Sequence, residues 1–258
     1  MMPFPEKQTA EKILHKTAEK IGKTEWYFAM HYYRFLEILT VILQKRNTKK
    51  RETVLELGVW PGYLSQALFE AGFDVWGVDF NPERLKNIDP GISLCRHDLN
   101  EAPLRIPHPD GFFDFIIISE TIEHLDSKNL PELFTEIRRL LCQNGTLILT
   151  TPSKNSLHNQ LSFLTKTRKV PQGGHGHLRE YSQKELREIL VASRMKTVKL
   201  ETINFYLNIG KAAPDKYFYP LKNFYQHSNK LFNLLKYFAI PLKKIAWLKD
   251  SIILIAQK

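Results

Sequence analysis

Two glycines close to a glutamate stand where a folded chain could hold a small ligand. The sequence Glu56-Leu-Gly58-Val-Trp-Pro-Gly62 places glycines four residues apart, directly after an apolar run. Glycines at this spacing permit a tight turn and a close approach of the backbone to a ligand. The loop has neither the lysine of a phosphate-binding loop nor a full Gly-x-Gly-x-x-Gly pattern, so phosphate binding is not indicated.

Carboxylates follow the next two apolar runs. Asp79 lies 21 residues after Gly58, the placement of a side chain that accepts hydrogen bonds from both hydroxyls of a ribose. Phe80, beside it, offers a flat surface to a base, and Asp98 offers an acceptor for an exocyclic amine. Together with the glycine turn, these residues predict a site for a nucleoside without phosphates.

The elements that must position these residues begin at residue 53. From there, short apolar runs alternate with stretches of helical periodicity, which is typical of an α/β domain with a doubly wound parallel sheet. In such a sheet the ligand lies beyond the carboxyl ends of the strands, where the glycines and carboxylates stand. We predict strands buried on both faces at 53–59, 74–80, 92–95, 113–118 and 146–150, and helices at 63–71, 82–88 and 129–142.

Further elements precede and follow this core. Apolar residues recur at three- and four-residue spacing through 6–46, which predicts two helices separated at Gly22. After Pro152 the chain is polar until a capping box of Ser182 and Glu185 begins another helix. We predict a helix at 182–194, a strand at 196–205 and a last strand at 251–258.

Positive charge is concentrated at both ends of the chain. The formal charge of +10 comes from 37 Lys and Arg against 27 Asp and Glu, of which residues 1–51 hold 11 and 5, and residues 206–258 hold 9 and 2. The middle of the chain is mildly acidic. Basic flanks favour contact with a substrate phosphate, a lipid surface or nucleic acid, or they serve only solubility.

The composition bounds the class of protein. With 43% hydrophobic and 25% charged residues, it excludes a disordered, collagen-like or coiled-coil chain. Cys95 and Cys142 are too few for a disulfide framework. No apolar run approaches the roughly 18 residues of a spanning helix, and the first residues lack the apolar core of a signal peptide. We therefore expect a cytoplasmic protein. If it contacts a membrane, we expect that contact to be peripheral.

Taken in order, these motifs resemble those of class I S-adenosylmethionine-dependent methyltransferases of the small-molecule type, similar to the ubiquinone and menaquinone biosynthesis methyltransferases. The resemblance covers roughly residues 53–205 and the last strand, and its later motifs are Phe113–Ser119 leading into Glu123-His124-Leu125, Leu141-x-x-x-Gly145-x-Leu-x-Leu, and His177–Ser182. It implies a Rossmann-like seven-stranded sheet of order 3-2-1-4-5-7-6 with the last strand antiparallel.

The predicted elements also divide the chain. Residues 1–51 would form an N-terminal helical extension on the substrate side, acting as a lid. Residues 52–258 would form the methyltransferase domain. Within that domain, residues 206–250 would form a helical insertion, which holds 10 of the 30 aromatic residues and a basic, amphipathic pattern.

S-adenosylmethionine is the cofactor that the resemblance implies. The first loop would hold its methionine half, Asp79 its ribose, Phe80 and Leu99 the faces of its adenine, and Asp98 the adenine amino group. The full cofactor-binding set is Glu56, Gly58, Trp60, Gly62, Asp79, Phe80, Asp98, Leu99, Ser119, Glu120 and Arg34.

Two members of this set are unusual. Trp60 stands where the family usually has a small residue, so we expect its indole to cover the cofactor or to reach the substrate. Arg34 lies in the N-terminal helices, from which it would meet the cofactor's carboxylate or remain an ordinary surface arginine.

Methyl transfer is an in-line displacement at a sulfonium, and a hydroxyl acceptor must lose its proton to a base. His177, in the polar loop that would cover the substrate, and His124, after the fourth strand, are the candidate catalytic residues. For either histidine, a loop-anchoring hydrogen bond is the alternative. The pair His175 and His177, together with Glu123, could suggest a metal site. Because no third ligand stands at a defined spacing from the pair, we expect no metal.

The predicted reaction is methyl transfer to a small or lipid- or glycan-linked acceptor, on oxygen. No Asn/Asp-Pro-Pro-aromatic motif follows the fourth strand and no cysteine stands where a cytosine methylase needs one, so we do not expect a nucleic-acid partner. The basic insertion would contact a membrane, guide a lipid-linked substrate, or pack on the enzyme itself or a second subunit. An RNA methyltransferase and a catalytically silent SAM-binding partner subunit stay open as alternatives. The oligomeric state is not predicted.

Overall fold

The computed structural model describes residues 5–21, 25–85, 88–156, 176–203 and 251–258. Its strands are β1 (Thr53–Leu57), β2 (Asp74–Asp79), β3 (Ser93–Arg96), β4 (Phe113–Ser119), β5 (Leu141–Pro152), β6 (Lys196–Ile203) and β7 (Ser251–Gln257). Its α-helices are α1 (Pro5–Ile21), α2 (Glu25–Lys45), α3 (Tyr63–Glu70), α4 (Leu130–Leu140) and α6 (Gln183–Ala192). Short 3-10 turns are η1 (Pro82–Arg84), η2 (Ile122–His124) and η3 (Ser127–Asn129).

The seven strands form one sheet in the order β3-β2-β1-β4-β5-β7-β6, as predicted. Strands β1 to β5 pair in parallel, and β7 runs antiparallel between β5 and β6. The chain therefore winds outward in both directions from β1 and β4. Ligands of such sheets bind at this switch point, beyond the carboxyl ends of the strands.

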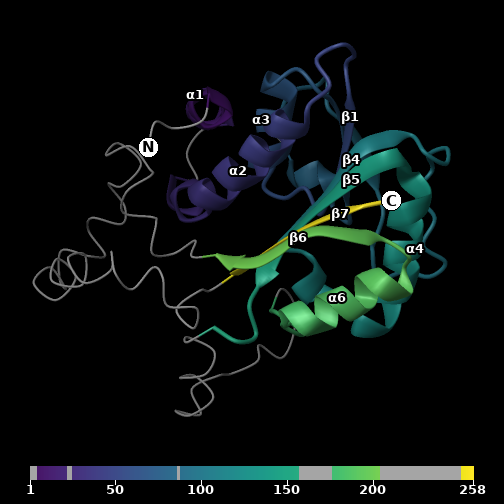
Figure 1. Cartoon of the computed structure of the whole chain (residues 1–258). Coiled ribbons are helices and arrows are strands. Elements are labelled where there is room, and N and C mark those ends of the chain that lie inside the picture. Colours follow the sequence, from purple (N-terminus) through teal and green to yellow (C-terminus); the bar gives the residue numbers. More distant parts are fainter. Residues whose placement is uncertain (1–4, 22–24, 86–87, 157–175, 204–250) are drawn as a thin grey trace, which may run out of the picture.

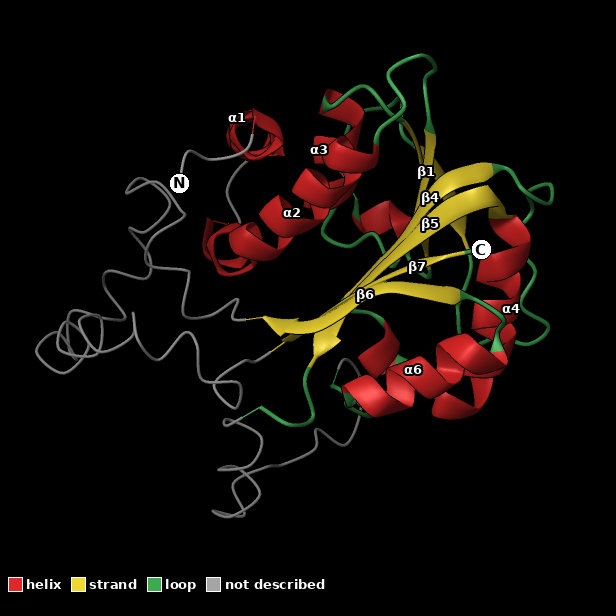
Figure 2. Ribbon diagram, in the orientation of Figure 1, coloured by secondary structure: helices red, strands yellow, loops and turns green. Residues whose placement is uncertain are grey.

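Helices cover both faces of the sheet (Figures 1 and 2). Helices α1, α2 and α3 lie on one face, and α4 and α6 lie on the other. Each face has its own hydrophobic cluster, because strands buried on both sides present apolar residues to both helical layers. Among the described residues, no helix combines the length and apolar character needed to cross a bilayer.

The sheet's edge strand differs from the prediction. We expected β3 to be buried on both faces, but its residues alternate between half-buried and exposed. Strand β3 is an edge strand with β2 on one side only, and its exposed residues, among them Leu94 at 37% exposure, share one face that stays open to solvent. The prediction of full burial was wrong for this strand.

Two predicted boundaries also moved. Helical structure predicted for 82–88 is limited to the single turn η1, because Leu85 has left the helical region at φ −88° and ψ 67°. The helix predicted for 129–142 ends at Leu140, and β5 starts at Leu141, which pairs with Phe113 before the register shifts. The helical insertion predicted for 206–250 lies outside the described residues.

Candidate active site

The loop after β1 needs glycine at its first turn. Gly58 has φ +83°, and a Cβ there would lie 2.4 Å from the Thr121 hydroxyl oxygen. The Gly58 amide donates to the carbonyl of Val78 at 2.8 Å, and Thr121 Oγ1 donates to the carbonyl of Leu57 at 3.2 Å. The glycine therefore lets the end of β2 and the segment after β4 pack against the turn that follows β1.

Gly62 begins the next element under the same constraint. Its φ is +98°, and a Cβ there would lie 2.6 Å from a methyl group of Ile88. Its amide closes a turn onto the Val59 carbonyl at 2.7 Å, and its carbonyl accepts from Gln66 in α3. The spacing of the two glycines thus reflects two separate close approaches.

Glu56 is a buried carboxyl group beneath this loop. It accepts a hydrogen bond from the Ser65 hydroxyl of α3. Burial raises the pKa of Glu56 to about 8, although the Ser65 hydrogen bonds and the positive charge of Arg34 oppose the shift. A cationic ligand placed here would favour the ionised carboxylate.

Asp79 ends β2 and is fixed by two backbone amides. Its Oδ2 accepts from the Trp60 amide at 3.1 Å, and its Oδ1 accepts from the Asn81 amide at 2.9 Å. Each oxygen keeps a further lone pair, so the carboxylate can also accept from paired hydroxyls. Phe80, the next residue, is 51% exposed.

The residues after β3 lie at the same edge, with different exposure. Asp98 is half-buried, and its Oδ1 accepts from the Asn100 amide at 2.8 Å. Leu99 is 6% exposed and packs in the cluster beneath α4 and α6. Only a small part of the Leu99 side chain is therefore accessible to a ligand.

Helix α2 brings Arg34 to the segment after β4. Arg34 is 3% exposed, and its Nη1 lies 3.0 Å from Oε2 of Glu120. Glu120 has φ +53°, in the left-handed region, and its Oε1 is buried with no hydrogen-bond partner among the described residues. The charge of Arg34 also opposes the rise in pKa of Glu56 and Glu123. Ser119 shares a 3.1 Å hydrogen bond with the Thr150 hydroxyl of β5.

Glu123, in η2, is fully buried. Its Oε2 accepts from the Thr151 hydroxyl at 2.9 Å, while its Oε1 is buried and lacks a hydrogen-bond partner in the described part of the chain. Burial, followed by the nearby charge of Glu120, raises the pKa of Glu123 well above its ordinary value. Glu123 therefore presents a carboxyl oxygen that can still accept a hydrogen bond or contact an ion.

The backbone of Glu123 recruits the distant segment that carries His177. The Glu123 carbonyl accepts from the amides of Leu178 at 2.7 Å and Arg179 at 3.2 Å. His124 Nδ1 lies 3.2 Å from the Gly176 carbonyl, and the His124 and His177 rings meet edge to face at 4.9 Å.

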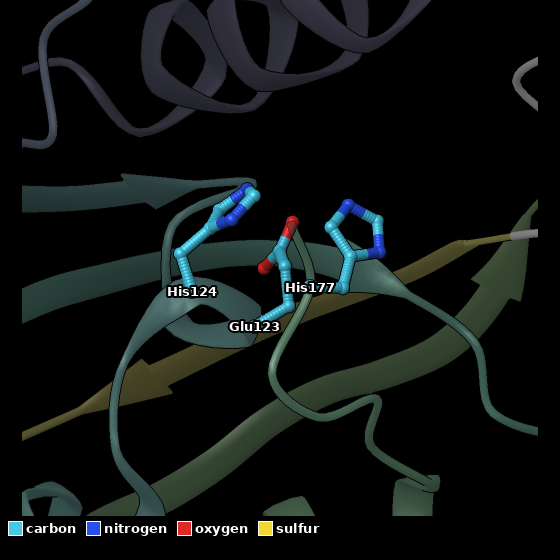
Figure 3. A group of neighbouring side chains, drawn as sticks. All are labelled: Glu123, His124 and His177. Carbon is cyan, nitrogen blue, oxygen red and sulfur yellow. The ribbon is translucent and has the colours of Figure 1, made fainter. Parts of the chain in front are cut away.

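Glu123, His124 and His177 consequently form a three-ligand group. Figure 3 shows the Glu123 carboxylate between the two imidazoles. One ligand atom from each of the three residues lies within 4.8 Å of the others. We expected no metal site because no third ligand had a defined spacing in the sequence; the fold brings His124, next to Glu123 in the chain, close enough to be a third candidate ligand.

Two aromatic side chains of α2, Tyr27 and His31, lie near the loop that follows β1. The Tyr27 ring lies 5.4 Å from Trp60 and 4.1 Å from His31. Burial raises the pKa of Tyr27 to about 12, and burial lowers the pKa of His31 well below its ordinary value, so both are neutral at pH 7. Sequence reasoning missed both residues, although they share a helix face with Arg34 at i, i+4 and i+7 spacing.

The profile of the methyltransferase domain family matches residues 28–193, more than half of the chain. The chain belongs to this methyltransferase family. The sheet order is shared with solved SAM-dependent methyltransferases, and S-adenosylmethionine is the cofactor of the methyltransferase family to which the chain belongs.

Two relatives bear the name ubiquinone biosynthesis O-methyltransferase. The one from Colwellia psychrerythraea is 25% identical over 133 residues, covering 48% of this chain and 52% of that enzyme. The one from Paraburkholderia xenovorans is 22% identical over 161 residues, covering 59% of this chain and 68% of that enzyme. The methyltransferase thus spans about half to two thirds of these relatives.

Solved structures share the fold. A SAM-dependent methyltransferase from Archaeoglobus fulgidus has a TM-score of 0.56 at 21% identity, covering 90% of this chain and 100% of that one. Phosphoethanolamine N-methyltransferase 2 of Haemonchus contortus, in complex with S-adenosyl-L-methionine, has a TM-score of 0.56 at 17% identity, covering 90% of this chain and 56% of that one.

Proposed function

We propose that this methyltransferase transfers a methyl group from S-adenosylmethionine to a hydroxyl oxygen of a small or lipid-linked acceptor, with the help of a divalent cation. The observation that carries the proposal is the group formed by Glu123, His124 and His177 at the carboxyl end of β4. This is the edge of the sheet at which class I enzymes hold their methyl donor.

The three side chains fit a divalent first-row transition metal ion, from Mn²⁺ to Zn²⁺. Two imidazoles and one carboxylate form a ligand set typical of such ions. Ligands that share one ion lie up to about 4.2 Å apart, so small side-chain rotations would close the present separation of up to 4.8 Å. The Gly176 carbonyl near His124 Nδ1 is the kind of outer contact that orients a ligating histidine.

A cation held here would lower the pKa of a coordinated acceptor hydroxyl, whose proton would pass to solvent water before the oxygen attacks the methyl group. In this arrangement His124 and His177 would hold the cation rather than act as the base. Glu123, whose carboxylate accepts a hydrogen bond from Thr151, would provide the third ligand to the cation. Alignment of the acceptor oxygen with the sulfonium methyl group supplies the main part of the acceleration.

The cofactor residues divide along the strand ends. Glu56, Gly58 and Gly62 hold the methionine half, and Asp79, with its two backbone amides, holds the ribose. Phe80 and Asp98, with the accessible part of Leu99, bind the adenine. Ser119 and the Arg34 and Glu120 ion pair lie between the cofactor and the acceptor.

Relatives support oxygen as the acceptor atom, because the two described above are named as O-methyltransferases of ubiquinone biosynthesis. We extend this to a lipid-linked acceptor, reached from the cytoplasmic side of a membrane by peripheral contact. The basic flanks of the chain are suited to an anionic lipid surface.

Methyl transfer from labelled S-adenosylmethionine to simple dihydroxybenzene acceptors tests the proposal. Transfer should fall at least about 100-fold after chelation with EDTA and return with Mn²⁺ or Zn²⁺. His177→Ala should behave like the chelated enzyme. His108→Asn should not, because His108 precedes β4, at the opposite edge of the sheet. Transfer that survives chelation unchanged would exclude the cation, and binding of S-adenosylmethionine without any transfer would favour the silent-subunit alternative.

A further inference from the structure

Two exposed aromatic residues stand beside Asp79. Trp60 is 46% exposed and Phe80 is 51% exposed, and they are the only aromatic residues among the large exposed hydrophobic side chains of the described residues. Trp60 donates its backbone amide to the Asp79 carboxylate, and Phe80 follows Asp79 directly. A ligand that binds the Asp79 carboxylate therefore lies next to the backbone of Trp60, whose indole is open to solvent.

The indole of Trp60 is held from two sides. The ring of Tyr27, on α2, meets it edge to face at 5.4 Å and 69°. The Arg84 guanidinium, in η1, lies over it at 5.3 Å from the ring centroid. Trp60 lies in the loop that connects β1 to α3. From there its indole contacts both helix α2 and the turn η1, which follows β2.

This arrangement is unusual for a ring that belongs to no hydrophobic core. Trp60 is a member of neither hydrophobic cluster, although Tyr27 packs against one of them. A large apolar ring that is ordered by its neighbours but left half in water gains free energy when a ligand covers it. Because its orientation is fixed beforehand, covering it costs little side-chain entropy.

We propose that Trp60, held by Tyr27 and Arg84, covers the ribose and methionine half of the bound cofactor and sets how slowly S-adenosylhomocysteine leaves. The inference rests on the proposed placement of the cofactor at Asp79, and it makes Trp60 a cofactor-contact residue of a kind that a small residue at this position cannot supply. The rival role, contact with the methyl acceptor, is an outcome of the test.

The test is the rate of S-adenosylhomocysteine dissociation, measured by stopped-flow displacement with a labelled cofactor analogue. Trp60→Ala should speed dissociation at least about tenfold with a small change in the association rate, and Trp60→Phe should stay within about threefold of the wild type. Arg84→Gln, which removes the cation over the ring, should give an intermediate rate. Trp76→Phe is the matched control, because Trp76 lies on β2 and contacts His108 and Phe112 rather than the loop.

The outcomes separate this inference from the proposed function. Unchanged dissociation in Trp60→Ala, or a change only in the KM for the acceptor, overturns it. Dissociation does not depend on the cation, so a methyl transfer that resists chelation defeats the proposed function and leaves this inference standing. If Trp60→Ala does not fold, Arg84→Gln decides, and a rate equal to that of the wild type overturns the inference.

Discussion

The two halves of the candidate active site are built in different ways. On the proposed cofactor side, Gly58 follows β1 and Asp79 ends β2, and both are fixed by backbone contacts at neighbouring strand ends. On the proposed acceptor side, Glu123 and His124 meet His177 across about 50 residues of chain. The first half is fixed at the strand ends, whereas the second depends on a distant segment docking on η2.

Because the two halves are built differently, substitutions in one half should affect cofactor binding and substitutions in the other should affect methyl transfer. Changes in the loop after β1 or at the end of β2 should remove cofactor binding without disturbing the three-ligand group. Changes at Glu123 or in the segment of 176–182 should remove methyl transfer and leave cofactor binding intact. The predictions that follow test this separation, beginning with the largest effect.

Asp79→Ala should abolish cofactor binding. Removal of the carboxylate deprives the ribose of its acceptor and releases the Trp60 amide, so affinity for S-adenosylhomocysteine should fall at least about 100-fold in calorimetry. Asp79→Asn, which keeps one acceptor oxygen, should lose less. Binding of the Asp79→Ala protein at wild-type affinity would contradict the cofactor placement, provided that its melting temperature shows a folded protein.

Glu123→Gln should separate the two halves in the other direction. The amide is close in size to the carboxyl group but cannot supply an anionic ligand, so methyl transfer should fall on the order of 100-fold. Affinity for S-adenosylhomocysteine should stay within about twofold of the wild type. A parallel loss of cofactor affinity would show that the two halves are one cooperative unit.

Gly58→Ala should destabilise the fold. The new methyl group would lie 2.4 Å from Thr121 Oγ1 at a residue with φ +83°, which we expect to lower the free energy of unfolding by about 2–4 kcal/mol. Gly111→Ala is the control, because Gly111 has φ +71° but its Cβ would meet no atom closer than 3.7 Å. Its cost should be about 1 kcal/mol in denaturant melts. Equal costs at both positions would remove the role of the Thr121 contact.

Glu56 should make cofactor affinity depend on pH. Its pKa is raised to about 8 in the cofactor-free protein, so at pH 7 the carboxyl is mainly protonated. The cationic groups of S-adenosylmethionine favour its ionised form, so binding should release a proton, and affinity should rise with pH until it levels near pH 8. Calorimetry in buffers of different ionisation enthalpy measures this proton. Glu56→Gln should release none.

The same shift has the opposite sign for folding. The folded-state pKa of Glu56 lies above its ordinary value because burial disfavours the ionised carboxylate. Ionisation of Glu56 therefore lowers the free energy of unfolding at high pH and has no such effect at low pH. The contribution of Glu56 should therefore become unfavourable as the pH rises from about 4.5 to about 8. Glu56→Gln should flatten this part of the stability profile, and an unchanged profile would exclude the shift.

Ser182→Ala should have the smallest effect. Ser182 and Glu185 form the capping box of α6 that the sequence predicted. Its loss should cost about 1 kcal/mol of unfolding free energy and should reduce methyl transfer more than cofactor binding, because the segment with His177 leads into this cap. Equal losses in both assays would indicate a global effect.

Most of the sheet could be predicted because each strand is a separate apolar run followed by its own turn residues. Glu56, Gly58, Asp79 and Phe80 could be placed for the same reason, since parallel strands end at one edge. The start of β5 at Leu141 could not, because Leu141 continues the apolar stripe of α4 and only its pairing with Phe113 makes it a strand.

The three-ligand group could not be predicted from spacing. His177 reaches Glu123 through backbone hydrogen bonds of Leu178 and Arg179, and no side-chain pattern encodes those bonds. Thr151, which holds the Glu123 carboxylate, has no distinguishing neighbours in the sequence either. Such contacts depend on tertiary packing, which local periodicity does not report.

We propose a cation centre beside an independent cofactor site. Manganese binding to the protein saturated with S-adenosylhomocysteine, followed by electron paramagnetic resonance, is the decisive measurement. We expect one Mn²⁺ bound per chain in the wild type, loss of that ion in Glu123→Gln and His177→Ala, and retention in His108→Asn. Absence of bound Mn²⁺ in the wild type, or binding that survives both ligand substitutions, would contradict it.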